Sequence, residues 1–235
     1  MTTCLIRLVL GSGGALAISA VVALTGCGSE VSTGGAGGQG GNGGGDSCSI
    51  FHGAEEPVEL VNLTVVNHSA NPIYLGDTQQ GCGTPLLYSA ETLSGDPVKT
   101  VMQACELTCS DLAQSSCGCA ADCAIPTVIM ILPNGSYSMT WARSVFEPTS
   151  MPLACYADPD CYSDTCLEGK DATAALRFSV AAYPELGDCS QAICDCDPGT
   201  VGSCVVDGAT IVGGAPVSAS TDWSPGDPDI VITVQ

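Results

Sequence analysis

Basic residues are scarce in this sequence of 235 residues, which contains only five Lys and Arg against 25 Asp and Glu. The formal net charge is therefore −20 at pH 7. Nucleic-acid binding requires a basic surface, so this class of function is excluded. The acidity keeps the chain soluble and repels anionic surfaces, and it attracts divalent cations or basic partners.

Histidine and catalytic motifs are also sparse. The two histidines are His52 and His68, and His68 lies in a predicted turn. The sequence contains no G-x-S-x-G, H-E-x-x-H, P-loop or dinucleotide-binding fingerprint. We therefore expect a protein that is not an enzyme. A hydrolase with two paired carboxylates is a distant alternative, because the abundant acidic residues do not single out a pair.

Long hydrophobic runs are absent too. Near the N-terminus, Arg7 precedes an apolar segment that runs from Ala15 to Leu24 with only Ser19 polar. A membrane-spanning helix needs about 20 apolar residues, so this segment is too short. A basic residue, a short apolar stretch and small residues after it are typical of an export signal. We predict that residues 1–26 form this signal.

The end of the signal carries a second motif. Leu24-Thr25-Gly26-Cys27 resembles the lipobox of bacterial lipoproteins. The resemblance implies that the signal is cleaved before Cys27 and that Cys27 carries lipid, which anchors the chain to a membrane. Gly28 and Ser29 follow, and they favour delivery to the outer membrane. We therefore expect an outer-membrane lipoprotein of the cell envelope, either periplasmic or exposed at the surface.

The residues after Cys27 predict a tether and one folded domain. Nine of the twelve residues from 34 to 45 are glycine, and such a segment has too little apolar surface to fold. Residues 27–47 are therefore predicted to be a flexible tether, and residues 48–235 a Cys-rich domain. Aromatic residues make up only 5% of the chain, so we expect a largely aliphatic core supported by covalent links.

Cysteine, by contrast, is abundant. Of the 16 cysteines, Cys4 lies in the signal and Cys27 is the expected lipid site. Disulfides are favoured for the other fourteen, since they persist outside the cytosol, and a zinc or iron–sulfur site is the alternative. The pairing stays open, except that the two members of each C-x-C should have different partners. The fourteen are Cys48, Cys82, Cys105, Cys109, Cys117, Cys119, Cys123, Cys155, Cys161, Cys166, Cys189, Cys194, Cys196 and Cys204.

Alternation with a period of two residues predicts an all-β domain. It is clearest in ELVNLTVVN from Glu59 and in SYSMTW from Ser136. Further strands are expected over 72–75, 127–132, 173–180, with Ala174 inward, and 230–234. Residues 133–135, Pro-Asn-Gly, predict a hairpin. Residues 101–116 predict a short helix.

Seven or eight short strands between Gly/Pro turns favour an immunoglobulin-like antiparallel β-sandwich with long disulfide-pinned loops. LVNLTVVNHSANPIYL and ILPNGSYSMTW resemble strands of immunoglobulin-like domains in bacterial lipoproteins. Trp141 is in phase with Tyr137 and Met139 and should pack in the core. Trp223 is expected in a loop, where it is a candidate for stacking on a sugar.

Two acidic runs near cysteines are candidate sites for weak structural Ca²⁺, because Ca²⁺ prefers several carboxylate oxygens on one loop. One contains Asp158, Asp160 and Asp164, and the other contains Asp195 and Asp197. Neither run matches an EF-hand, and the alternative is that these aspartates are turn residues. No other cofactor is expected.

The sequence thus predicts a lipid-anchored, disulfide-stabilised envelope protein with a binding or structural role. The expected partners are the membrane, through the lipid, and a protein or glycan ligand. The main alternative is an inhibitor of secreted proteases, because long pinned loops on a sandwich can present a segment to a protease cleft.

Overall fold

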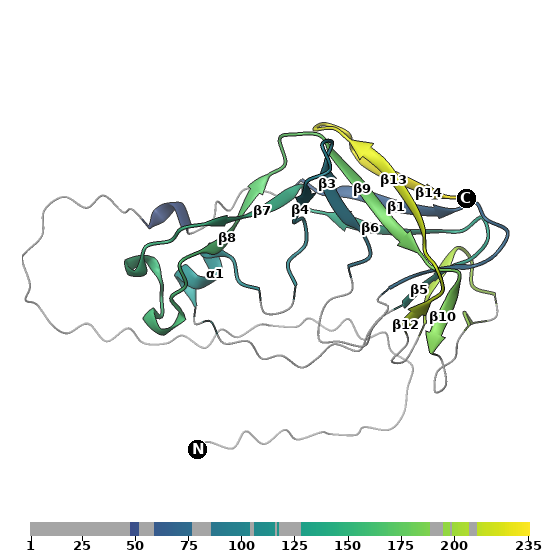
Figure 1. Cartoon of the computed structure of the whole chain (residues 1–235), viewed down its shortest axis with the longest axis horizontal. Coiled ribbons are helices and arrows are strands. Elements are labelled where there is room, and N and C mark those ends of the chain that lie inside the picture. The colour runs from purple at the N-terminus through teal and green to yellow at the C-terminus, as the bar shows by residue number, and fades with distance from the viewer. Residues whose placement is uncertain are drawn as a thin grey trace, which may run out of the picture. The chain divides into compact units, whose positions relative to one another are not determined.

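The computed structural model describes residues 48–51, 59–76, 86–103, 106–115, 117, 128–188, 195–197, 199–206 and 211–235 (Figure 1). All of them belong to one compact unit, Gly44–Gln235. Strands dominate this unit, and the described residues contain one short α-helix. No helix in the described part of the chain is long and apolar enough to cross a membrane.

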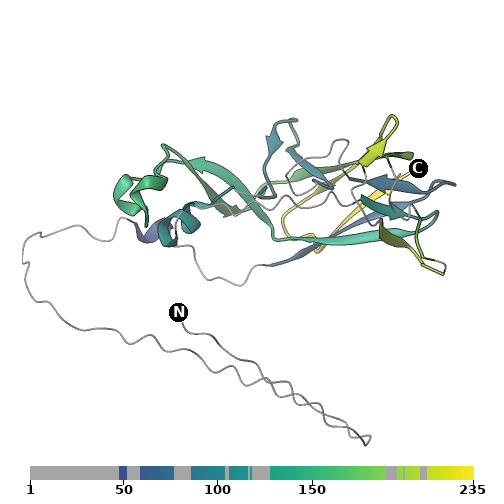
Figure 2. The ribbon, with the colours of Figure 1, turned by 90° about the horizontal axis from the view of Figure 1, so that it is seen from below.

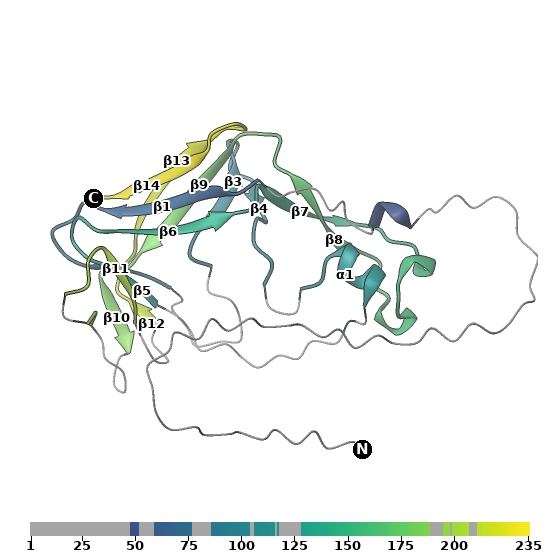
Figure 3. The same cartoon turned by 180° about the vertical axis from the view of Figure 1, so that it is seen from behind.

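Sheet A has the strand order β14-β1-β6 and joins the two ends of the domain (Figure 3). Strand β1 (Val61–Asn67) pairs in parallel with β14 (Asp229–Val234) and antiparallel with β6 (Ser136–Trp141). Alternate residues of β1 are buried, as the sequence predicts. The inward apolar residues are Val, Leu or Ile in β1 and β14 and Tyr, Met and Trp in β6, so these strands bury one apolar face and leave the other to solvent.

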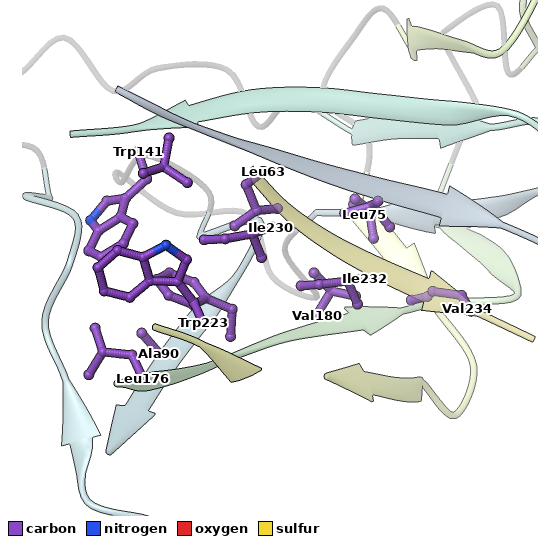
Figure 4. Packing of buried hydrophobic residues seen from close by; sticks show 14 of the residues in the cluster. Leu63, Leu75, Ala90, Trp141, Leu176, Val180, Trp223, Ile230, Ile232 and Val234 are labelled. Atoms are coloured by element: carbon purple, nitrogen blue, oxygen red, sulfur yellow. The ribbon is translucent and has the colours of Figure 1, made fainter. Parts of the chain in front are cut away.

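Sheet C has the order β13-β9-β3-β4. Its strands are β3 (Ser89–Thr92), β4 (Pro97–Val98), β9 (Leu176–Ala182) and β13 (Val217–Trp223). The buried side chains of sheets A and C meet in one hydrophobic core, where Trp141 and Trp223 lie edge to face with ring centroids 4.9 Å apart (Figure 4). The core is otherwise mostly aliphatic, as the composition predicts.

Sheet B has the order β11-β5-β2 and adds to this core. Its strands are β2 (Ile73–Leu75), β5 (Val128–Ile131) and β11 (Ser203–Val206). All four residues of the central strand β5 are buried, because Ile129 and Ile131 face the main core while Val128 and Met130 face a second cluster. The hairpin of β10 (Glu185–Asp188) and β12 (Ile211–Gly213) contributes Leu186 and Val212 to that cluster.

A two-stranded ribbon carries the Cys-rich part of the domain (Figure 2). It consists of β7 (Ser144–Thr149) and β8 (Cys166–Asp171). Beside its far end lie three 3₁₀ turns, η1 (Ser49–Phe51), η2 (Leu153–Cys155) and η3 (Pro159–Cys161), and the helix α1 (Cys109–Gln114). We call this assembly the disulfide lobe, and its buried residues form a cluster separate from the main core.

The predicted all-β sandwich with largely antiparallel sheets and disulfide-pinned segments is confirmed, although β1 and β14 are parallel. The predicted helix is shorter than expected, because Thr108 caps it through a capping box with Asp111. The inward placement of Ala174 is wrong, since β9 begins only at Leu176 and Ala174 is exposed.

The predicted hairpin over 133–135 is wrong as well. Gly135 N donates to Leu132 O, so a tight turn does form, but β5 and β6 belong to different sheets. Gly202 explains the choice of glycine here, because a side chain at Gly135 would collide with the Gly202 backbone. The turn therefore passes the chain from sheet B to sheet A.

Candidate functional site

Four disulfides connect described cysteines: Cys48–Cys155, Cys109–Cys166, Cys117–Cys161 and Cys196–Cys204. Neither Cys117 nor Cys196 bonds to its C-x-C neighbour, as predicted for such pairs. Disulfides of this number indicate an extracellular or envelope protein. The other six cysteines of the domain lie outside the described residues, namely Cys82, Cys105, Cys119, Cys123, Cys189 and Cys194. The lipid site Cys27 lies outside them too.

The first predicted calcium run lies on the disulfide lobe and serves local turns. Asp158 caps η3, where its Oδ1 accepts a hydrogen bond from Asp160 N at 3.0 Å. Asp164 Oδ1 accepts from the Tyr162 hydroxyl at 3.2 Å, which raises the pKa of Tyr162. Among the described residues, no group of three His, Cys, Asp or Glu side chains is placed to hold a metal ion. The carboxylates of Asp158 and Asp164 therefore have hydrogen-bond partners in the turns themselves.

The second run lies beside the Cys196–Cys204 disulfide. Asp195 and Asp197 are both exposed, and Asp195 Oδ1 accepts a hydrogen bond from Cys196 N at 2.9 Å. Trp223, the predicted sugar-stacking residue, is only 1% exposed at the end of β13. Its Nε1 donates to Asp227 O at 3.0 Å, so it is a core residue and not a binding platform.

The candidate binding site is a pocket of about 400 Å³ where the ribbon meets sheet C. We call it the ribbon groove. One wall is the β3–β4 hairpin, the other is the ribbon, and the segment 172–176 between β8 and β9 closes it. Phe146 N donates to Lys99 O at 2.8 Å and holds the two walls together. Its apolar lining includes Val98, Val145, Phe146, Pro148 and Leu176.

Ion pairs form the rim of the ribbon groove. Lys99 Nζ lies 2.6 Å from Glu106 Oε1, and Lys170 Nζ lies 3.0 Å from Glu147 Oε2 and 3.3 Å from Glu168 Oε2. The hydrogen bond from Lys99 lowers the pKa of Glu106, and the Thr149 hydroxyl followed by Lys170 lowers the pKa of Glu168. Glu147 and Glu168 raise the pKa of Lys170. These groups therefore stay charged near neutral pH and fix the rim.

All four basic residues beyond Arg7 lie in the described part of the chain, and each is ion-paired. Besides the two lysines, Arg143 pairs with Glu59, and Arg177 Nε lies 2.8 Å from Asp222 Oδ1. Arg143 also lies over the Trp223 ring, 5.7 Å from its centroid. No cation among the described residues is thus left for an anionic ligand.

The size and the lining of the ribbon groove make it a candidate binding site. Pockets of roughly 300–1,000 Å³ with an apolar lining and a few polar groups are typical of ligand sites. Among the described residues, no His or Cys lines it, and its carboxylates are paired or exposed. The arrangement can hold a neutral or cationic ligand against an apolar floor, with the ion pairs supplying hydrogen bonds.

Sequence reasoning missed this site. Its walls come from segments that are far apart in the chain, near residues 92–99, 145–148 and 170–176. The sequence offers one weak indication of the site. In SVFEPT, the apolar Val145 and Phe146 are followed directly by Glu147 and Pro148. His68, the one described histidine, is exposed in the turn after β1, as predicted.

Comparisons with known proteins found no family model, no curated protein and no solved structure that matches this chain.

Proposed function

We propose that this chain is a lipid-anchored, disulfide-stabilised protein of the bacterial outer membrane that binds a protein or glycan ligand and has no enzymatic activity. The ribbon groove is the observation that carries the binding role, since it joins an apolar floor to a charged rim. Cys27 carries the lipid, and residues 27–47 hold the domain away from the membrane.

The charges of the described residues narrow the ligand class. Every described Lys and Arg is paired with a carboxylate, so anionic polymers gain no free cation. Neutral glycans and neutral or basic peptides need no free cation. Peptides with apolar side chains also match the apolar floor made by Val98, Val145 and Phe146. We therefore propose a neutral or basic peptide segment first and a neutral glycan second.

Binding of the purified full chain to peptide and glycan arrays tests this role. Ala174 is exposed and lines the groove, so Ala174→Trp fills the groove without changing the core. Ala70 is exposed in the turn after β1, and Ala70→Trp is the matched control. Array binding that Ala174→Trp removes and Ala70→Trp keeps supports the proposal. Equal binding by both variants refutes the groove as the site.

The lipid anchor has a separate test. Mass spectrometry of the chain extracted from bacterial membranes should find Cys27 as the acylated N-terminal residue. Cys27→Ser should release the chain from the membrane fraction. A membrane-bound Cys27→Ser chain, or an unacylated N-terminus, would refute this part of the proposal without touching the binding role.

One observation favours protease inhibition as a second candidate function. Residues 162–165 are exposed between Cys161 and Cys166, which are both buried and disulfide-bonded. Tyr156 holds this loop through a hydrogen bond from its hydroxyl to Ser163 O at 2.7 Å. A rigid exposed loop loses little entropy on binding. Near-stoichiometric inhibition of a protease panel, lost in Tyr162→Ala, would favour this function, and uninhibited proteases would exclude it. A hydrolytic enzyme is the distant third candidate.

A further inference from the structure

Within the described part of the chain, strand β6 is paired along one edge alone. It pairs with β1 on one side, and no described residue pairs with its other side. Asn67 N donates to Gly135 O at 2.9 Å, which fixes the phase of the ladder. In an antiparallel ladder the hydrogen-bonded residues alternate, so Tyr137, Met139 and Trp141 bond to β1. The N–H and C=O groups of Ser136, Ser138 and Thr140 therefore point away from the sheet.

Gly202 lies beside Ser136 at one end of this edge, but the edge lacks the charged residues and proline that usually protect exposed edges. Natural edge strands are guarded by charged residues, proline or a covering segment. Residues 128–142 contain no charge, although the chain as a whole carries −20, and β6 itself has no proline. The other described edge strands of six residues or more contain charges: Glu147 in β7, Lys170 in β8, Asp222 in β13 and Asp229 in β14. Figure 3 shows β6 on the side of β1 away from β14.

We propose that this edge of β6 is a docking site for the same edge of a second copy of the chain. The three outward residues are symmetric about Ser138, as a twofold axis requires. An antiparallel pair centred there would place Ser138 opposite Ser138 of the second copy and Ser136 opposite Thr140. The outward N–H and C=O of Ser138 then gain partners at the axis, and Gly202 lies beside Ser136 at each end of the pair.

The side chains are self-complementary in the same register. Tyr137 and Met139 are half-buried on the core side of β6, and this pairing sets each beside the other across the axis. Sulfur–aromatic contacts of this kind are favourable. On the solvent side only Ser136, Ser138 and Thr140 meet, so no like charges oppose each other. Sheet A would thereby extend from three strands to six across the two copies.

Charge opposes this association at long range only. Two strongly acidic copies repel one another, and salt screens repulsion beyond the Debye length, about 10 Å at 0.1 M. Self-association should therefore tighten when the salt concentration rises from about 0.05 M to about 0.5 M. An interface made by ion pairs would show the opposite dependence.

Sedimentation equilibrium of the purified full chain tests the proposal with two variants. Ser138→Pro removes the outward N–H at the axis and, of the bonds to β1, only the 2.9 Å hydrogen bond between Ser138 Oγ and Thr64 Oγ1, so it should weaken self-association roughly tenfold or more. Ser138→Cys should form an intermolecular disulfide under mild oxidant, because paired Cα atoms of this type lie about 5.5 Å apart. Ser220→Cys, on exposed β13, is the control that should not cross-link.

The expected result is a salt-strengthened dimer that Ser138→Pro dissociates and Ser138→Cys traps, with unchanged far-ultraviolet dichroism in both variants. A chain that stays monomeric up to about 1 mM at both salt concentrations overturns the proposal. A dimer that survives in Ser138→Pro, or that cross-links equally through Ser220→Cys, overturns it too.

Discussion

Asn67 makes the sharpest stability prediction. It is fully buried at the end of β1, with 0% of its surface exposed. Its Nδ2 donates to Asn71 O at 2.8 Å, to Ile131 O at 3.0 Å and to Leu132 O at 3.2 Å. Its Oδ1 accepts from Ser69 N at 2.9 Å and from Ser69 Oγ at 2.7 Å. One amide therefore ties the end of sheet A to the end of sheet B.

Asn67→Asp keeps the shape of the side chain and removes its donors. Three carbonyl oxygens then face a carboxyl group, and each buried carbonyl without a partner costs about 1–3 kcal/mol. Because such costs are not additive, we expect Asn67→Asp to lower the free energy of unfolding by about 3–5 kcal/mol. In a domain of this size that corresponds to a fall in melting temperature of roughly 6–20 °C.

Urea unfolding at neutral pH, with the disulfides intact, measures this loss. Asn71→Asp is the control, because Asn71 is exposed and only its main-chain carbonyl contacts Asn67. It should change the stability by less than about 0.5 kcal/mol. A loss below about 1 kcal/mol in Asn67→Asp, or equal losses in both variants, would refute the role assigned to Asn67.

Three further predictions concern the turn, the rim and the disulfide lobe. Gly135→Ala should destabilise the domain more than Gly95→Ala in thermal unfolding, because a side chain at Gly135 collides with Gly202 whereas Gly95 has open space and only a positive φ of 93°; equal losses would refute this reading. Glu106 and Glu168 have lowered folded-state pKa values, so their stabilisation is present above the ordinary value of 4.5 and is lost as the pH falls through the folded values. Melting curves of Glu106→Gln plus Glu168→Gln should thus depend less on acidic pH than those of the wild type, and unchanged curves would contradict it. Cys109→Ser with Cys166→Ser opens a loop whose ends are 57 residues apart, which the chain-entropy model values at about 4 kcal/mol. Hydrogen exchange should show lost protection in α1 and the 3₁₀ turns and kept protection in β1 and β14; equal loss everywhere would show that the lobe and the sandwich unfold together.

The alternating strands could be predicted because their burial is a local property of the sequence. Val61, Leu63 and Val65 in β1, and Ile230 and Ile232 in β14, face the core as their period of two residues requires. The position of β5 followed from its unbroken apolar run, which suits a strand buried on both faces.

The sequence-based predictions are wrong where contacts between segments far apart in the chain determine the structure. The Pro133-Asn134-Gly135 turn has hairpin chemistry, yet the partners of β5 are β11 and β2, so the turn joins two sheets. Trp223 stands beside turn residues in the sequence, but its ring is buried against Trp141 from β6. Cys48 and Cys155 are 107 residues apart, and no spacing rule selects such a pair.

The ribbon groove could not be predicted from the sequence for the same reason. Each of its walls has ordinary composition, and only the Phe146–Lys99 hydrogen bond and the ribbon geometry bring them together. The ion pairs at its rim could not be predicted from the sequence either. The sequence shows four basic residues beyond Arg7 but not that each would be paired with a carboxylate.

The most direct test of the ribbon groove as the binding site is a hydrogen-exchange footprint of the full chain, measured with and without the ligand that binds most strongly on the arrays. Binding in the ribbon groove should slow exchange in β4, in residues 145–148 of β7 and in 172–176, with little change in β1 and β14. Protection confined to the disulfide lobe, or none in the segments of the ribbon groove, would contradict the proposed binding site.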